Sequence, residues 1–285
     1  MIVDLTISRD HGLCDRLRAV TYFMAVARLS GDALLELHEP PSKHCPYRMC
    51  DSIEFDGLEL RPFEGTPPAG SRSLTPHASP ALDSAQKHLP AGLDVTAVDF
   101  LHHWIDSYTL IQPKPAVRAL LDALPVSRRT LGVHVRRTDK VREWPSRYEL
   151  SPQESARGDQ AMEQHVRRKV SSGAIDSVFI ASDSAEGRHD WMERLSTLGV
   201  PVFVHDAAFH PDRLRQTDAT DFFVDLFALS RCGAIVGNVC SGVGFSARYI
   251  GRIAHFDTIT EPESLVFPRL LERIGRRLRR LVVRG

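Results

Sequence analysis

The sequence predicts an α/β fold with parallel sheets, divided into two domains. Apolar patterns of strand and helix type alternate along much of the chain, and a strand–helix–strand unit typical of a parallel sheet appears first within residues 2–37. The short apolar run Leu131–Val135 reads as a fully buried strand. With 285 residues, of which 42% are hydrophobic, the chain is long enough for two domains of ordinary size.

Residues 1–110 are expected to form the first domain. Residues 39–90 are poorly patterned and rich in proline, glycine and serine, so we interpret residues 62–80 as an extended loop. The expected regular elements are a strand at 2–7, a helix at 15–29 with Asp15 as its N-cap, a strand at 33–37 and a helix around 95–110.

Residues 111–285 are expected to form the second domain. The last segment, residues 262–285, is a basic amphipathic stretch that either packs on the domain or lies on an anionic membrane surface. The other expected elements are helices at 116–124, 151–170, 221–230 and 245–250, and strands at 131–135, 177–181, 200–204 and 233–237.

The most informative stretch is LGVHVRRTDKVRE, residues 131–143, where a buried strand ends in adjacent arginines. In an α/β fold the carboxyl ends of the strands open onto the ligand crevice, so Arg136, Arg137 and Lys140 would face a phosphorylated ligand. The alternative is a solvated loop in which the two arginines pair with Asp139 and Glu143.

Two further segments fit a nucleotide ligand. Ser241, Gly242 and Val243 stand between a strand and a helix, where backbone amides and the helix N-terminus favour phosphate oxygens. Asp225 lies among apolar residues and needs a partner, and guanine offers two parallel donors that fit a carboxylate. The alternative for Asp225 is a position on the helix surface.

Two other charged sites are less specific. Asp183 follows the strand at 177–181, where it either faces the crevice or caps the next helix. Arg16 and Arg18 either approach the ligand or lie on the surface of the first helix, and the second interpretation is the simpler one.

Bulk properties exclude several classes. The 36 basic and 36 acidic residues balance, which argues against general attraction to nucleic acid. We find no secretory signal pattern and no apolar run long enough to span a membrane, so we expect a cytoplasmic protein, at most peripheral to the membrane. Five cysteines without secretory context are expected to be reduced.

The string HVRRTDK resembles the donor-binding motif of the α-1,6-fucosyltransferase family. Three further stretches resemble the same family in the same order. They are HGLCDRLRAVTYFMAVARLSGDALLEL, WIDSYTLIQPKPAVRALL and DLFALSRCGAIVGNVCSGVGFSARYIG. The resemblance implies a GT-B-like fold of two facing Rossmann-like domains, the first facing the acceptor and the second holding GDP-β-L-fucose. It also implies inverting transfer of L-fucose to a hydroxyl of a glycan or oligosaccharide, which could be lipid-linked, without a metal or other cofactor.

The resemblance also assigns roles to residues. Arg137, with Arg136, would stabilise the leaving diphosphate in place of a metal ion, and Lys140 would steady the phosphate or sugar. Asp225 would read guanine and His134 would line the nucleotide, while Asp183 would lie on the sugar or acceptor side. Glu143 is the candidate base, although the family places its glutamate four residues beyond the lysine and Glu143 is three beyond Lys140; Asp139, Asp183 and Glu149 are the reserves.

Three alternatives remain open. The donor could be another GDP-sugar, or the chain could be a non-catalytic module that binds a phosphorylated ligand. A nicotinamide-dependent oxidoreductase is suggested by the pattern G-x-G-x-x-A at Gly242, Gly244 and Ala247, with Asp257 ending the next strand. The spacing to Asp257 is shorter than that fingerprint requires, and the helix expected between them is brief.

Overall fold

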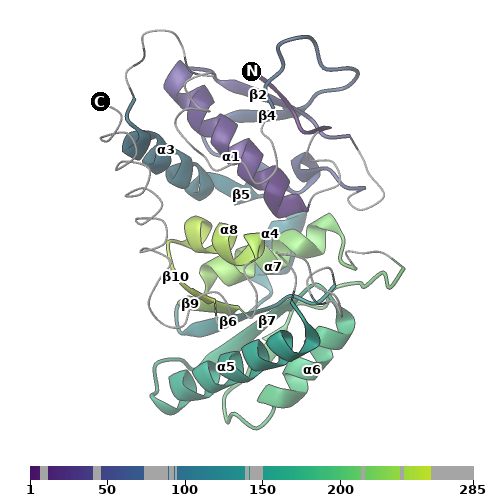
Figure 1. The fold of residues 1–285 in the computed structure, drawn as a ribbon, viewed down its shortest axis with the longest axis vertical. Helices are drawn as coiled ribbons and strands as arrows, with labels where there is room; N and C mark the ends of the chain where they lie inside the picture. Colours follow the sequence, from purple (N-terminus) through teal and green to yellow (C-terminus); the bar gives the residue numbers. More distant parts are fainter. Residues whose placement is uncertain are drawn as a thin grey trace.

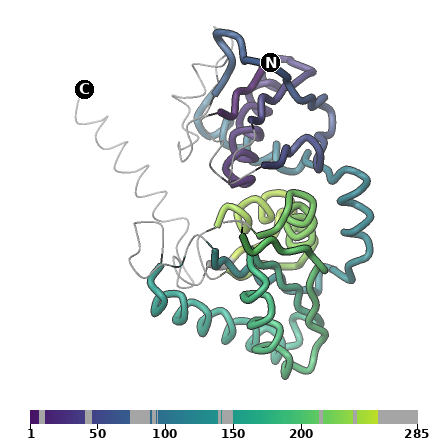
Figure 2. The backbone as a smooth tube through the Cα atoms, turned by 90° about the vertical axis from the view of Figure 1, so that its right-hand side faces the viewer, coloured from purple at the N-terminus to yellow at the C-terminus, as the bar shows by residue number. Residues whose placement is uncertain are grey.

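The structure is a computed structural model that describes residues 1–6, 12–40, 46–73, 89, 93, 95–138, 141, 150–212, 216–237 and 241–257. Two halves lie one above the other (Figure 1), and the view turned by 90° shows the same arrangement (Figure 2). Each half is built on a parallel sheet. The predicted α/β class and the two halves expected of a GT-B-like fold are confirmed.

The first half is organised around a three-stranded parallel sheet in the order β1-β2-β4. Helix α1 lies against this sheet and is buried along most of its length. The elements are β1 (Ile2–Asp4), α1 (Leu13–Ser30), β2 (Leu34–His38), the 3-10 helix η2 (Met49–Asp51), β3 (Ile53–Phe55), β4 (Glu59–Pro62), α3 (Ala97–Thr109) and β5 (Ile111–Pro113).

Several details of this half differ from the predictions, and one of them is that strand β4 lies in residues 39–90, where no strand was predicted. The N-cap of α1 is Gly12, and Asp15 lies inside the first turn, so the predicted capping role of Asp15 is wrong. Strands β3 and β5 form a small antiparallel pair that the sequence did not predict, because each is three residues long and β5 ends in proline. Strand β5, which follows the predicted boundary at residue 110, thus pairs with a strand of the first half.

The second half contains a five-stranded parallel sheet in the order β10-β9-β6-β7-β8. Helices α5 and α6 cover one face of the sheet, while α7 and α8 lie between the other face and the first half (Figure 1). The elements are α4 (Pro115–Asp122), β6 (Thr130–Val135), α5 (Pro152–Ser171), β7 (Ser177–Ser182), α6 (Ala185–Leu195), β8 (Val202–Val204), α7 (Ala219–Arg231), β9 (Ala234–Gly237), α8 (Gly242–Gly251) and β10 (Ala254–Asp257).

Strand β6 is the centre of this sheet and is buried at every position. Its apolar side chains pack on the α5 and α6 side. On the other side Gly132 faces α7, where a Cβ atom would lie 2.7 Å from Leu229 Cδ2. Burial on both faces explains why the strand reads as a short apolar run rather than as an alternating one.

The predicted strands and helices of the second half are found within a few residues of their predicted bounds. Helix α8 is the exception, because it begins at Gly242, three residues earlier than predicted, and has ten residues. The helix is therefore less brief than the sequence suggested. The basic stretch at residues 262–285 lies outside the described residues.

The halves meet through α1, α3 and α8. A Cβ atom on Gly242 would lie 2.6 Å from the Cβ atom of Cys14, so α8 touches the first turn of α1. Further along α8, the ring of Tyr249 lies 5.4 Å from that of Tyr108 and 6.3 Å from that of Trp104. These contacts bring the first turn of α1 next to the beginning of α8. Within the described part of the chain, no helix combines the length and apolar character needed to cross a membrane.

Candidate functional site

The turn after β6 is held by Asp183, which follows the neighbouring strand β7. One carboxylate oxygen of Asp183 accepts the backbone N–H of Arg137 at 2.8 Å. The other accepts the hydroxyl of Thr138 at 2.6 Å and its N–H at 3.3 Å, and lies 3.2 Å from Arg136 Nε. Asp183 therefore fixes the arginine turn. It does not cap the next helix, since Ser184 is the N-cap of α6, so the capping interpretation is wrong.

Arg137 has a second anchor that the sequence analysis missed. Its Nη2 donates to Asp159 Oδ2 on α5 at 2.6 Å, and the two side chains are 20% and 8% exposed. A Cβ atom on Gly187 would lie 3.1 Å from Arg137 Cγ, so Arg137 also runs close to the start of α6. Asp159 could not be recognised as a partner from the sequence because it stands among many charged residues of a polar helix.

His134, the fifth residue of β6, is buried. Burial, together with the positive charge of Arg136 and the nearby His255, lowers the pKa of His134 to about 3. The ring is therefore neutral near pH 7, with one nitrogen as a donor and the other as an acceptor. It adds no positive charge to the site.

A second charged pair joins the start of α6 to α7. Arg188 Nη2 donates to Asp225 Oδ2 at 3.3 Å, its Nη1 donates to the carbonyl of His205, and its guanidinium lies 4.6 Å from the ring centroid of Phe209. Both side chains are less than 10% exposed, so the interpretation of Asp225 as a surface residue is wrong. Arg188 could not be recognised from the sequence, because it is one of many charged residues on an amphipathic helix.

Asp225 is incompletely bonded within the described structure. Its Oδ1 is buried and has no hydrogen-bond partner among the described residues, and neither does Nε of Arg188. Burial raises the pKa of Asp225 to about 7, although Arg188 and His205 act in the opposite direction. An unsatisfied buried acceptor costs about 1–3 kcal/mol, so Oδ1 is a place where a donor would be favourable.

The beginning of α8 lies at the carboxyl end of β9, beside the arginine turn in the sheet order. Ser241 is the N-cap, and its hydroxyl oxygen accepts the N–H of Val243 at 3.3 Å. A phosphate oxygen at this helix end would compete with that cap. Gly242 is the first helical residue and packs against Cys14.

Helix α8 also contains the G-x-G-x-x-A pattern that suggested a nicotinamide-dependent oxidoreductase. Gly242, Gly244 and Ala247 all lie inside α8, whereas that fingerprint places its first glycines in the turn before the helix. A Cβ atom on Gly244 would lie 2.5 Å from His255 Nε2, so the contact with β10 accounts for this glycine. Helix packing thus explains the spacing without a cofactor.

The predicted site residues therefore fall into two groups. The first group lies at the carboxyl ends of neighbouring strands of the second sheet: His134, Arg136, Arg137 and Asp183 at the ends of β6 and β7, and Ser241, Gly242 and Val243 after β9. Asp225 is linked to this group indirectly, because it pairs with Arg188, whose neighbour Gly187 lies close to Arg137. Lys140, Glu143, Asp139 and Glu149 lie outside the described residues.

Arg16 and Arg18 belong to the first half. Arg16 is fully buried, with Nη1 donating to the carbonyl of Tyr47 at 3.4 Å, so its interpretation as a surface residue is wrong. Arg18 is half-buried. No group of three or more His, Cys, Asp or Glu side chains suited to a metal ion occurs in the part of the chain that the structure describes. The lack of a metal requirement stays a prediction.

No protein-family model matches the chain, and no curated protein matches it. Among solved structures it is similar to NodZ α-1,6-fucosyltransferase soaked with GDP-fucose, with 15% identity, a TM-score of 0.49, and 87% of this chain and 91% of that one covered. For FUT1 of Arabidopsis thaliana, mutant R284K with GDP, the identity is 12%, the TM-score 0.48 and the coverage 89% and 69%.

POFUT1 in complex with GDP-fucose has 15% identity, a TM-score of 0.39 and 55% of this chain covered, and the chain spans about half the length of POFUT1. With identities this low and TM-scores below 0.5, these similarities assign neither a family nor an activity to the chain.

Proposed function

We propose that the chain is a glycosyltransferase that transfers L-fucose from GDP-β-L-fucose to a hydroxyl of a glycan or oligosaccharide, with inversion and without a metal ion. The observation that carries this proposal is the buried Oδ1 of Asp225, which has no partner among the described residues. Asp225 is linked to the arginine turn after β6 through Arg188, whose neighbour Gly187 lies close to Arg137. A guanine N–H would satisfy that oxygen, and the arginines would meet the diphosphate.

The arginine turn suits a leaving diphosphate. As the bond between the sugar carbon and the phosphate oxygen breaks, negative charge collects on the GDP oxygens, and fixed positive groups stabilise it without reorganisation. The Arg136 and Arg137 side chains are 14% and 20% exposed and are held in place by Asp183 and Asp159. Their charge would thus be positioned before the donor arrives.

The transfer also needs a base. The acceptor oxygen attacks the sugar carbon from the face opposite the diphosphate, the bond to GDP breaks, and the acceptor proton passes to a carboxylate. Glu143 is the residue we propose for this step, with Lys140 steadying the phosphate or sugar. The resemblance of the string HVRRTDK to the α-1,6-fucosyltransferase motif supports fucose as the sugar.

Thermal-shift titration tests the nucleotide assignment. GDP, IDP, UDP, ADP and NAD would each be added with and without a chelator, because a ligand that binds only the folded state raises its melting temperature. We expect the largest shift with GDP, independent of the chelator, and a smaller shift with IDP, which lacks the 2-amino donor. The proposal fails if NAD gives the largest shift or if GDP, UDP and ADP are equivalent.

Two variants sharpen this test. Arg137→Lys keeps a positive charge but loses the planar fork, and should reduce the GDP shift. Arg129→Lys is the matched control. Arg129 forms an exposed ion pair with Asp176, 2.7 Å long, and is not part of the arginine turn. Equal GDP shifts for both variants would contradict the role of Arg137. Turnover of GDP-fucose by the wild type, followed as GDP release, then tests the sugar.

A further inference from the structure

The first half contains a small open cavity at the carboxyl ends of β2 and β4. Its volume is about 140 Å³, which corresponds to about five water molecules at a liquid volume of about 30 Å³ each, so the cavity has room for one small polar group such as a single sugar unit. The lining residues are Leu37, His38, Glu39, Pro40, Arg48, Pro62, Phe63, Glu64 and Gly65. In open parallel sheets, ligands bind outside this end of the strands.

The cavity is connected to the candidate site by the first turns of α1. Arg16 of this helix donates to the carbonyl of Tyr47, directly before Arg48 of the cavity. Two residues earlier, Cys14 packs against Gly242 at the start of α8. A molecule in the cavity would thus lie on the other side of α1 from the predicted phosphate site.

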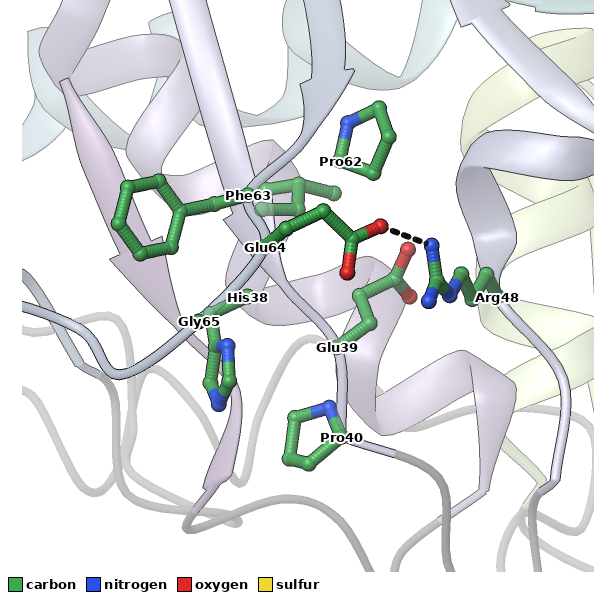
Figure 3. A pocket seen from close by; sticks show the side chains of 9 residues that line it. His38, Glu39, Pro40, Arg48, Pro62, Phe63, Glu64 and Gly65 are labelled. Atoms are coloured by element: carbon green, nitrogen blue, oxygen red, sulfur yellow. Dashed lines mark hydrogen bonds and ion pairs between the residues drawn. The ribbon is translucent and has the colours of Figure 1, made fainter.

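Hydrogen bonds hold the backbone beside the cavity in place. The buried carboxylate of Glu39 accepts the backbone N–H groups of Met49 and Cys50 at 3.0 and 3.3 Å, which fixes the segment that follows Arg48. Lys114, the N-cap residue of α4, donates to the carbonyl of Cys50 and holds the same segment. Figure 3 shows the carboxylates of Glu39 and Glu64 and the guanidinium of Arg48 turned toward one another, with Pro40 and Pro62 on either side.

The cavity lining carries two carboxylates, Glu39 and Glu64, and one guanidinium, Arg48. Arg48 Nη1 lies 2.6 Å from Glu64 Oε1, and these side chains are 41% and 71% exposed. An exposed ion pair of this kind stabilises a fold by only about 0–1 kcal/mol, so the pair is not needed to hold the chain together. It does offer donors and acceptors side by side, which fit hydroxyl groups, since each hydroxyl both donates and accepts.

We propose that this cavity binds one neutral sugar unit of the acceptor. The inference rests on the proposed function, because it gives the acceptor a place in the half opposite the donor. The excess of carboxylates over guanidinium groups in the lining disfavours an acidic sugar, and the two prolines provide apolar surfaces for the C–H groups of a neutral one.

Saturation-transfer NMR on the full chain tests the proposal, with maltotriose, cellotriose, chitotriose and trigalacturonic acid as probes. At least one neutral trimer should bind, and Arg48→Gln and Glu64→Gln should each weaken its binding at least fivefold. The matched control is the pair Arg61→Gln and Glu59→Gln, because this ion pair on β4 has the same 2.6 Å distance and similar exposure but does not line the cavity.

The outcomes separate this inference from the proposed function. If no neutral trimer binds, if trigalacturonic acid binds best, or if the cavity and control variants behave alike, the cavity is not a neutral-sugar site. The GDP titration is measured on the same variants and should be unchanged. A normal GDP shift with no effect of Arg48 and Glu64 on sugar binding would overturn the cavity alone, whereas sugar binding that depends on both residues without any GDP shift would overturn the donor assignment alone.

Discussion

Asp183 and Asp225 both belong to the second half, both are largely buried and both pair with an arginine, but they differ in how completely they are bonded. Both oxygens of Asp183 are occupied, by backbone and side-chain donors of the arginine turn. One oxygen of Asp225 contacts Arg188, and the other has no partner among the described residues. A carboxylate whose two oxygens both have hydrogen-bond partners stabilises the local structure, while a carboxylate with one oxygen left without a partner can accept a hydrogen bond from a ligand. We therefore interpret Asp183 as part of the framework and Asp225 as part of the binding surface.

The largest expected effect comes from breaking the framework. Asp183→Ala removes the acceptor for Arg136, Arg137 and Thr138 and leaves a mostly buried guanidinium without this carboxylate. Losing one partner of a buried pair costs about 3–5 kcal/mol, and the 14% exposure of the Asp183 side chain places this case near the lower limit. Urea denaturation should show a loss of about 3 kcal/mol in the free energy of unfolding.

Asp176→Ala is the control for that measurement. Asp176 lies 2.7 Å from Arg129, but the side chains of Asp176 and Arg129 are 53% and 62% exposed. Its loss should cost less than about 1 kcal/mol. If the two variants lose equal stability, Asp183 does not hold the arginine turn and the contrast with Asp225 disappears.

The second prediction concerns the pH dependence of stability. The pKa of Asp225 is about 7 in the folded state and near its ordinary value in the unfolded state. Between these values the folded state binds the proton that the unfolded state has released. The free energy of unfolding of the wild type, measured relative to Asp225→Asn, should therefore fall as pH rises from about 4 to about 7 and level off above that. The slope is at most about 1.4 kcal/mol per pH unit.

Saturating GDP sharpens this test. A guanine N–H that donates to Oδ1 would favour the ionised carboxylate and lower its pKa, so GDP should flatten the slope in the wild type. The measurement is urea denaturation at several pH values, with and without GDP. A stability difference between wild type and Asp225→Asn that is the same at pH 5 and pH 8 would mean that Arg188 keeps Asp225 ionised throughout, and the contrast would fail.

Much of the fold could be predicted because its strongest signals are local. Strand β6 was predicted from an apolar run that is followed directly by charged residues. Because ligands bind at the carboxyl ends of the strands in such sheets, the arginine turn could then be predicted to lie on the ligand side. Helix α5 was predicted from its pattern and from Pro152, and the structure adds a capping box between Ser151 and Glu154. These features depend on residues close together in the sequence.

The missed features depend on residues far apart. Arg188 and Asp225 are 37 positions apart, and Arg137 and Asp159 are 22 apart. Nothing in the local pattern distinguishes these charged residues from the solvated ones around them. Arg16 was misread for the same reason, because the groups that surround it, Tyr47 and Glu39, come from a poorly patterned segment. Packing between elements, rather than local propensity, decides which charges are buried.

The smallest predicted effect measures the contribution of a single hydrogen bond to Asp183, the one donated by the Thr138 hydroxyl. Thr138→Val keeps the shape of the side chain but removes the hydroxyl that donates to Asp183 Oδ2 at 2.6 Å. The same oxygen still accepts the Thr138 N–H and lies beside Arg136 Nε, so it does not become unsatisfied. Urea denaturation should therefore show a loss of about 1 kcal/mol, the net value of a single hydrogen bond.

Combining Thr138→Val with Asp183→Ala then tests whether the turn acts as a unit. Once Asp183 is gone, the hydroxyl has lost its acceptor, so Thr138→Val should cost almost nothing in that background. The double variant should be about as stable as Asp183→Ala alone, giving a coupling energy near 1 kcal/mol. Additive losses would mean that the hydroxyl stabilises the fold through some other contact. In that case the framework role of Asp183 would rest on the two arginines alone.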